Sequence, residues 1–215
     1  MRVLVIDDHP LILEALSQLL PQLTPGTEVV VARDRVEAET ALDDDPAIAL
    51  VLLDLALPGT RGLDFLADLQ LDYPGVPVVV LSATHDQGTV TAALAAGARG
   101  FIPKTANAAA LLEALKMVMN GGVYVTGELR AGLAADGVHL SPDELGLTLR
   151  QGDVLKLLVQ GKPNKLICRD LKLSEGTVKV HVSAILKALH VHSRTQAVAE
   201  LARRGISVDT LAAPR

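Results

Sequence analysis

The sequence predicts two domains: an α/β domain built on a doubly wound, parallel five-stranded sheet, followed by a smaller all-helical domain. In the first 125 residues, short apolar runs alternate with amphipathic segments, whereas from residue 147 onward only helical patterns remain. The net charge changes sign between the same two parts of the chain. Residues 1–125 carry 7 Lys and Arg against 16 Asp and Glu, and residues 148–215 carry 12 against 5. We therefore expect an acidic and a basic domain with different partners.

Five short runs of β-branched residues or leucine are typical of strands covered on both faces, because they lack apolar–polar alternation. These runs are Val3–Ile6, Glu28–Val31, Ala49–Leu53, Val78–Leu81 and Gly100–Ile102. Five amphipathic segments alternate with them: Leu11–Leu20, Arg35–Leu42, Gly62–Leu71, Thr89–Ala96 and Ala108–Met119. Short right-handed crossovers of this kind require a parallel sheet, whose functional site lies beyond the carboxyl ends of the strands.

Polar side chains follow the predicted strands at that edge. Asp7 and Asp8 end the first strand, Asp54 the third and Ser82 the fourth, while Lys104 follows the fifth. Three neighbouring carboxylates raise one another's pKa, so such a cluster tends to hold a proton or a cation. Oxygen ligands favour a hard ion such as Mg²⁺. A lysine and a hydroxyl beside that ion could neutralise a phosphoryl group.

The basic end of the chain predicts a helix-turn-helix. Helices are expected over Gly152–Gln160, Asn164–Leu171 and Glu175–Leu189, with Ser174 as the cap of the third. The connection before Ser174 is only a few residues long. Two helices joined by so short a turn place the second of them in the major groove of DNA.

The predicted groove helix has a packed face and a free face. Its apolar stripe consists of Val178, Val182, Ile185 and Leu189. The residues predicted to contact DNA are Lys179, Val180, Ser183, Lys187, Lys165, Thr177 and Arg194. Lysines and hydroxyls can bind phosphates or base edges, and a valine can contact a thymine methyl group.

Residues 1–122 resemble the receiver domain of bacterial two-component response regulators, which has a flavodoxin-like fold. The matching motifs are Asp7-Asp8-His9-Pro10, Asp54 with Leu57-Pro58-Gly59, Ser82-Ala83 and Gly100-Phe101-Ile102-Pro103-Lys104. The resemblance implies that Asp54 accepts a phosphoryl group from a sensor histidine kinase. It implies Mg²⁺ ligation by Asp8, Asp54, the backbone carbonyl of Ala56 and, through water, Asp7. Lys104 and Ser82 would bind phosphoryl oxygens, and Phe101 would change rotamer.

Two residues in these motifs have simpler interpretations. Phe101 could be an ordinary core aromatic residue. None of the six histidines forms a paired metal-binding motif, so His9 is expected at the entry of the first helix, before Pro10, rather than as a metal ligand.

Residues 147 to about 201 resemble the LuxR-type DNA-binding domain. The matching residues include Leu147-Thr148, Gly161, Asn164-Lys165, Ser174-Glu175, Thr177-Val178-Lys179-Val180-His181-Val182 and Ser193-Arg194. The resemblance implies that Lys179, Val180 and Ser183 face the groove. It also implies that a last helix, around Thr195–Arg204, pairs subunits, so that a homodimer binds DNA. Leu149 and Gln151 depart from the usual Leu-Thr-Pro-Arg-Glu opening, and Ser183 replaces a frequent basic or amide residue.

Residues 123–146 are predicted to link a receiver domain of residues 1–122 to a DNA-binding domain of residues 147–215. The stretch Gly121–Gly146 contains six glycines and could include a short helix over Glu128–Ala135. No apolar run approaches the roughly 20 residues that span a bilayer, and the start of the chain lacks a secretory signal. The lone Cys168 excludes an intramolecular disulfide. We expect a cytoplasmic protein without a membrane partner.

The sequence therefore predicts a DNA-binding transcriptional response regulator, not a turnover enzyme, in which phosphorylation of Asp54 controls dimerisation and promoter binding. One alternative keeps DNA binding but makes the receiver a phosphorylation-independent dimerisation or ligand module. An aspartyl-phosphate hydrolase is disfavoured, because Ala56 stands where such an enzyme of the haloacid dehalogenase family places a second acid.

Overall fold

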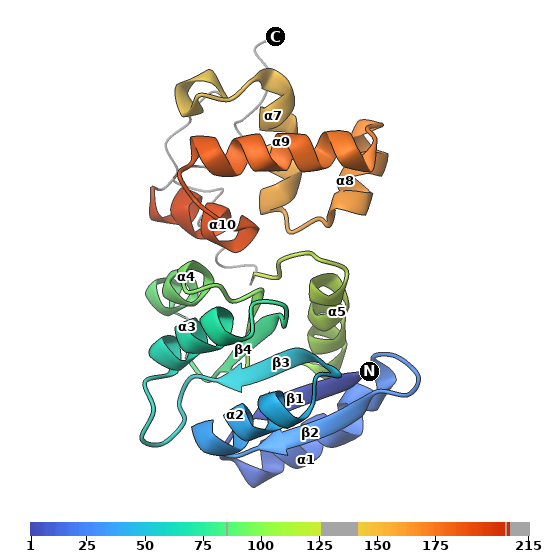
Figure 1. Ribbon diagram of the computed structural model, residues 1–215, viewed down its shortest axis with the longest axis vertical. Coiled ribbons are helices and arrows are strands. Elements are labelled where there is room, and N and C mark those ends of the chain that lie inside the picture. Colours follow the sequence, from blue (N-terminus) through green and yellow to red (C-terminus); the bar gives the residue numbers. More distant parts are fainter. Residues whose placement is uncertain (85, 126–141, 205, 207–215) are drawn as a thin grey trace. The chain divides into compact units, whose positions relative to one another are not determined.

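The computed structural model describes residues 1–84, 86–125, 142–204 and 206 (Figure 1). The chain divides into two compact units, Met1–Met119 and Asn120–Arg215. Each unit is described by itself. The short helix considered for Glu128–Ala135 lies outside the described residues.

The first unit contains one parallel sheet with the strand order β2-β1-β3-β4-β5. Its strands are β1 (Arg2–Ile6), β2 (Glu28–Ala32), β3 (Ile48–Asp54), β4 (Val78–Ser82) and β5 (Gly100–Pro103). The order is that of a doubly wound sheet, which confirms the predicted fold class. The chain leaves β1 toward one edge of the sheet and β3 toward the other, so the carboxyl ends of these neighbouring strands form the switch point.

Five helices cover the sheet: α1 (Pro10–Leu19), α2 (Arg35–Asp44), α3 (Gly62–Asp72), α4 (Gln87–Ala95) and α5 (Ala108–Met119). A 3₁₀ helix, η1 (Leu20–Gln22), extends α1. Asp34 and Asp86 cap α2 and α4 by accepting backbone N–H groups, as favoured at helix N-termini. Because helices cover both faces, the residues of β4 are all buried and β3 is buried at six of its seven positions.

The loop after β3 is fixed by a close backbone approach. A Cβ atom on Gly62 would lie 2.3 Å from the carbonyl oxygen of Leu55, so only glycine allows α3 to begin there. This contact holds the residues that follow Asp54 against the start of α3.

The second unit is helical, as predicted. It contains η2 (Asp143–Leu145), α7 (Leu149–Val159), α8 (Asn164–Leu171), α9 (Glu175–Ala188) and α10 (Arg194–Arg203). The turn between α8 and α9 is made by Lys172, whose φ of 54° is left-handed, and by Leu173, before Ser174 caps α9. This short connection has the form of a helix-turn-helix.

Helix α7 begins three residues earlier than the sequence pattern indicates. Thr148 Oγ1 accepts the backbone N–H of Gln151, and Gln151 Oε1 accepts the N–H of Thr148 at 2.8 Å. This reciprocal capping box satisfies two donors at the helix start. Gln151 therefore performs the capping that a glutamate would perform at the same position.

The second unit also includes the stretch that follows α5. Val123 and Val125 are buried, and the N–H of Val123 donates to the carbonyl of Gly161 at 3.3 Å. The start of the predicted linker is thus attached to the turn between α7 and α8.

Candidate phosphoryl-acceptor site and DNA-binding surface

The carboxyl ends of β1 and β3 bring three carboxylates together. Asp7 and Asp8 follow β1, and Asp54 is the last residue of β3. The exposed fraction is 0 % for Asp7 and 1 % for Asp54, whereas Asp8 is half-buried. Buried carboxylates need compensating partners, because charge is costly to remove from water. The sheet therefore places at one point acids that must be paired, protonated or bound to a cation.

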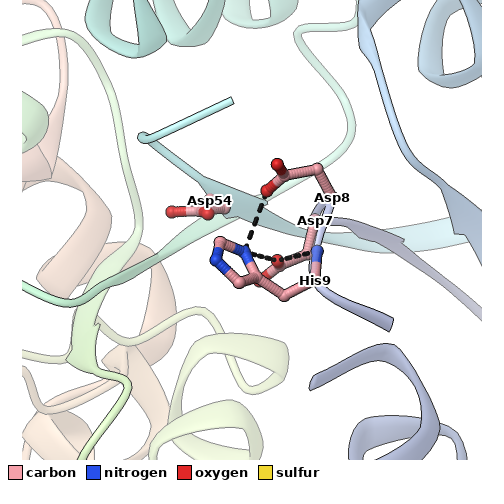
Figure 2. A group of neighbouring side chains, drawn as sticks. All are labelled: Asp7, Asp8, His9 and Asp54. Atoms are coloured by element: carbon pink, nitrogen blue, oxygen red, sulfur yellow. Dashed lines mark hydrogen bonds and ion pairs between the residues drawn. The ribbon is translucent and has the colours of Figure 1, made fainter. Parts of the chain in front are cut away.

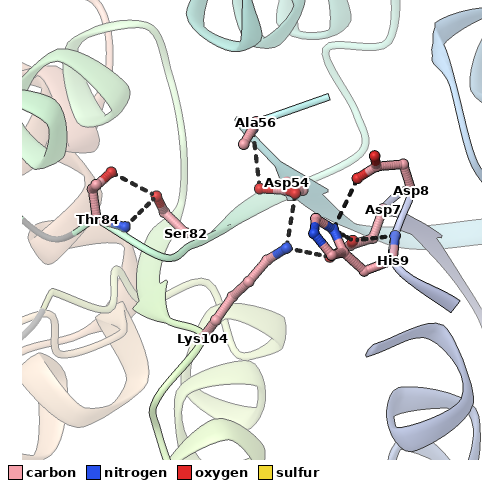
Figure 3. Close-up of polar contacts among 8 residues, drawn as sticks. All are labelled: Asp7, Asp8, His9, Asp54, Ala56, Ser82, Thr84 and Lys104. Carbon is pink, nitrogen blue, oxygen red and sulfur yellow. Dashed lines mark hydrogen bonds and ion pairs between the residues drawn. The ribbon is translucent and has the colours of Figure 1, made fainter. Parts of the chain in front are cut away.

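Lys104, just after β5, supplies one such partner (Figure 3). Its Nζ lies 2.7 Å from Asp7 Oδ2 and 2.8 Å from Asp54 Oδ2. Burial disfavours the charged lysine, but hydrogen bonds and charge attraction from Asp54 and Asp7 outweigh that cost and raise the pKa of Lys104. The lysine is therefore a fixed positive charge that bridges the two buried acids.

The second oxygen of Asp54 is held by the backbone. The N–H of Ala56 donates to Asp54 Oδ1 at 3.0 Å, and Ala56 itself is exposed. Asp54 is thus anchored at both oxygens, with Lys104 on one and a backbone amide on the other. This arrangement orients the carboxylate beside a loop that solvent reaches.

Ser82 ends β4 at the same edge, and its hydroxyl contacts Thr84. Ser82 Oγ accepts the N–H of Thr84 at 3.2 Å and lies 3.2 Å from Thr84 Oγ1 (Figure 3). Phe101, in the middle of β5, is fully buried. The structure therefore brings Ser82 to the site edge and places Phe101 in the core of the sheet.

His9 joins the acids, which sequence reasoning did not predict. Its ring Nδ1 lies 3.0 Å from Asp7 Oδ1 and 2.9 Å from Asp8 Oδ1 (Figure 2). His9 is also the residue before Pro10 at the start of α1, as expected. The only signal in the sequence was its position next to Asp8.

The donor set fits a divalent cation. Single ligand atoms of Asp7, Asp8, His9 and Asp54 all lie within 4.8 Å of one another. Three carboxylates against one lysine leave two formal negative charges, and carboxylate oxygens suit hard ions. The side chains present can therefore hold Mg²⁺ or a related ion.

Helix α9 carries the predicted DNA-facing residues on its exposed side. Lys179, Val180, Ser183 and Lys187 are all exposed, and Val180 has 68 % of its surface accessible. On the opposite side of α9, the predicted apolar stripe is covered: Val178, Ile185 and Leu189 are buried and Val182 is half-buried. The helix therefore packs with its apolar stripe inward and leaves two lysines outward.

The other predicted contacts lie at the start of the same motif. Thr177 is exposed and its N–H donates to the cap residue Ser174, while Lys165 is exposed on α8. Lys179 Nζ lies 3.1 Å from the carboxylate of Glu175, one turn before it. Such exposed pairs are weak, so Lys179 can exchange this partner for a phosphate.

Comparison with known families accounts for both sites. A model of the response regulator receiver domain matches residues 3–116, and a model of the luxR family of bacterial regulatory proteins matches residues 145–201. The chain belongs to the LuxR family of response regulators. It is a two-component transcriptional regulator with a receiver domain and a DNA-binding helix-turn-helix domain.

Relatives match this response regulator along almost its whole length. The glycerol metabolism activator of Pseudomonas putida is 36 % identical over 205 residues, which cover 92 % of this chain and 93 % of the relative. The nitrate/nitrite response regulator protein NarL of Escherichia coli K12 is 37 % identical over 202 residues, covering 91 % and 92 %. One of these relatives is named an activator and the other a response regulator.

A solved structure agrees with the receiver fold. A LuxR family DNA-binding response regulator from Silicibacter pomeroyi shares 32 % identity with this chain and superposes with a TM-score of 0.53. The match covers 60 % of this chain and 98 % of that one.

The structure corrects the prediction for Arg194 of the response regulator. Only 8 % of Arg194 is exposed. Its guanidinium donates to the carbonyl of Leu158 at 3.1 Å and also to the carbonyl of Lys162. Arg194 thus joins the start of α10 to the end of α7 and the turn after it. The side chain is inside the domain, away from the exposed residues of α9 that the sequence predicts to face DNA.

No helix in the described ranges is long and apolar enough to cross a membrane.

Proposed function

We propose that this response regulator accepts a phosphoryl group on Asp54 from a sensor histidine kinase, and that phosphorylation controls dimerisation and promoter binding in the cytoplasm. The observation that carries the proposal is the bridge from Lys104 to Asp54 and Asp7, within an acid cluster at the sheet edge. A nucleophilic carboxylate beside a fixed cation is what phosphoryl transfer to an acid requires.

In the proposed step, an Asp54 oxygen attacks phosphorus, and the N–P bond of the kinase phosphohistidine breaks as the O–P bond forms. The histidine leaves with the bonding electron pair and takes up a proton. Lys104 then exchanges its contact with Asp54 for a phosphoryl oxygen. Mg²⁺ held by Asp8, Asp54 and the Ala56 carbonyl, with Asp7 acting through water, would supply charge neutralisation.

Ser82 and Phe101 are proposed to change conformation in response to the phosphoryl group on Asp54. The Ser82 hydroxyl would exchange Thr84 for a phosphoryl oxygen, which draws the end of β4 toward Asp54. Phe101 would then change rotamer within the core of the sheet. Such an exchange of partners biases the receiver between two arrangements.

For DNA recognition, we propose that Lys179, Val180 and Ser183 face the major groove. Lys165, Thr177 and Lys187 would contact the phosphates that flank it. A homodimer paired through α10 would place two copies of α9 on two half-sites.

The test is intact mass spectrometry after incubation with Mg²⁺ and a small acyl phosphate. The wild type is expected to gain a single phosphoryl increment and Asp54→Asn none. Asp72→Asn, at the exposed end of α3, serves as the matched control and should gain the same increment as the wild type. An equal increment in Asp54→Asn would contradict the assignment. No increment in any of the three proteins would favour a receiver that works without phosphorylation.

A further inference from the structure

We propose that His9 is a nitrogen ligand of the receiver's cation site and shifts the preference of that site toward later first-row dications such as Co²⁺. The proposal rests on the cation site of the proposed function. It adds to that site a residue outside the acid cluster and a preference in metal type.

The imidazole ring of His9 lies beside the carboxylates of the site. His9 Nδ1 lies 2.9 Å from Asp8 Oδ1 and 3.0 Å from Asp7 Oδ1. A ring nitrogen of His9 also lies within 4.8 Å of a carboxylate oxygen of Asp54. Adjacent ligands of an octahedral ion at about 2.1 Å from the metal are about 3 Å apart. The nitrogen therefore stands at the spacing of a neighbouring ligand from both carboxylates (Figure 2).

Both carboxylate oxygens of Asp7 already have partners. Its Oδ1 accepts the backbone N–H of His9 at 2.9 Å, and its Oδ2 faces Lys104 at 2.7 Å. Asp8, by contrast, contacts the His9 ring through Oδ1 at 2.9 Å. An ion that enters beside Asp8 therefore meets the imidazole before it meets Asp7.

The ring of His9 can move while the backbone of the residue is fixed. His9 is the N-cap of α1, and its carbonyl accepts the N–H groups of Ile12 and Leu13 at 3.1 and 3.2 Å. Pro10 fixes the next residue at the helix start. The side chain is nevertheless 59 % exposed. The exposed ring can adjust its position beside Asp8 and present Nδ1 to an ion without disturbing the helix.

The chemistry then sets the selectivity. Mg²⁺ prefers oxygen ligands, whereas imidazole nitrogen is favoured by later first-row dications. A site made of carboxylates alone binds such ions through oxygen, and a nitrogen ligand adds to the affinity for them. With His9 as a ligand, the affinity for such an ion rises and the affinity for Mg²⁺ stays nearly the same.

The experiment titrates full-length protein with Co²⁺ and, separately, with Mg²⁺ in a calorimeter at one neutral pH. We expect His9→Gln to weaken Co²⁺ binding at least about tenfold and to change Mg²⁺ binding less than about twofold. His192→Gln is the matched control, because His192 is an exposed histidine of the second unit. It should leave both affinities unchanged.

Proton NMR of the Co²⁺-loaded protein provides a second measurement. A ligating His9 gives an exchangeable ring N–H signal with a large paramagnetic shift, absent in His9→Gln and present in His192→Gln. Equal Co²⁺ affinity in the wild type and His9→Gln, together with the absence of that signal, would overturn the inference. Mg²⁺ binding in that case would still support the cation site of the proposed function. If Asp8→Asn weakened the binding of neither Co²⁺ nor Mg²⁺, the inference about His9 and the cation site of the proposed function would both be overturned.

Discussion

The two functional regions are built in opposite ways. At the receiver edge, Asp7 and Asp54 are almost fully buried and are joined by one lysine at 2.7 and 2.8 Å. On α9, Lys179 and Lys187 are exposed, and Lys179 is paired with Glu175, one turn before it on the same helix. A buried polar network holds its geometry before any ligand arrives, whereas an exposed surface acquires its geometry on binding.

A mutation should therefore have different effects in the two regions. In the receiver site, removing one partner leaves a buried charge unpaired, so folding stability and chemistry change together. On α9, removing a lysine leaves nothing buried, so affinity changes and stability does not. Three of the four predictions below test this contrast, and the last tests an ion pair of intermediate exposure.

The largest effect is expected for Lys104→Met. Asp7 and Asp54 would then face each other without a cation, so the free energy of unfolding of the receiver should fall by about 3 kcal/mol. Mg²⁺ should restore part of the loss, because the ion replaces the missing charge. Hydrogen exchange of β3 amides in the full-length protein measures this local stability. Lys187→Met, on the exposed face of α9, should leave it unchanged, and unchanged exchange in Lys104→Met would refute the contrast.

The next largest effect is expected for Arg194. This residue belongs to the DNA-binding domain, but it is buried and hydrogen-bonded, as the acids of the receiver site are. Arg194→Met should leave the carbonyls of Leu158 and Lys162 without their donor and lower the stability of α7 by about 2 kcal/mol. Hydrogen exchange of α7 amides provides the measurement. Arg169→Met, at an exposed position of α8, is the control and should stay within about 0.5 kcal/mol of the wild type. Equal stability of the two variants would count against the buried role.

A smaller effect is expected for Lys179→Ala. DNA affinity should fall by about 1 kcal/mol, and because Lys179 is proposed to face base edges, the slope of log affinity against log salt should change by less than one. Fluorescence anisotropy with labelled DNA at several salt concentrations measures both quantities. Lys116→Ala in the receiver is the control. A drop in the stability of α9 as large as the drop in affinity would show that Lys179 is a structural residue instead.

The smallest effect is a pH dependence in α10. The hydrogen bond from Arg203, aided by Arg204 and opposed by burial, lowers the pKa of Glu200 from 4.5 to about 2. A lowered carboxyl pKa stabilises the fold above the ordinary pKa and loses that contribution as pH falls toward the folded value. Glu200→Gln should therefore cost about 1 kcal/mol near neutral pH, discounted for the exposure of the arginines. The difference from the wild type should shrink below about pH 4.5, as measured by urea unfolding. A difference independent of pH would exclude the ion pair as its cause.

Much of the fold and the acid cluster could be predicted because both follow from chain order. Parallel strands must bring their carboxyl ends to one edge, so Asp7, Asp54, Ser82 and Lys104 could be grouped without knowing any side-chain position. The stripe of Val178 and Ile185 likewise follows from helical period alone.

What could not be predicted depends on where individual side chains turn. A basic residue near a DNA-binding motif was counted as a DNA contact, but Arg194 found two carbonyls at the end of another helix. His9 was expected only as the start of α1, and its ring instead turned back to Asp8. Gln151 departs from the usual opening of the motif, and its side chain completes a capping box. Each outcome depends on tertiary neighbours rather than on local pattern.

The central claim is that charge on Asp54 governs DNA binding by α9. It is tested most directly by selecting a DNA fragment from a random pool with phosphorylated wild type, then measuring its affinity with and without acyl phosphate and Mg²⁺. Wild-type affinity should increase on phosphorylation, and Asp54→Asn should bind weakly under both conditions. An equal response of Asp54→Asn, or a wild type whose affinity does not change once mass spectrometry has shown it to be phosphorylated, would contradict the account.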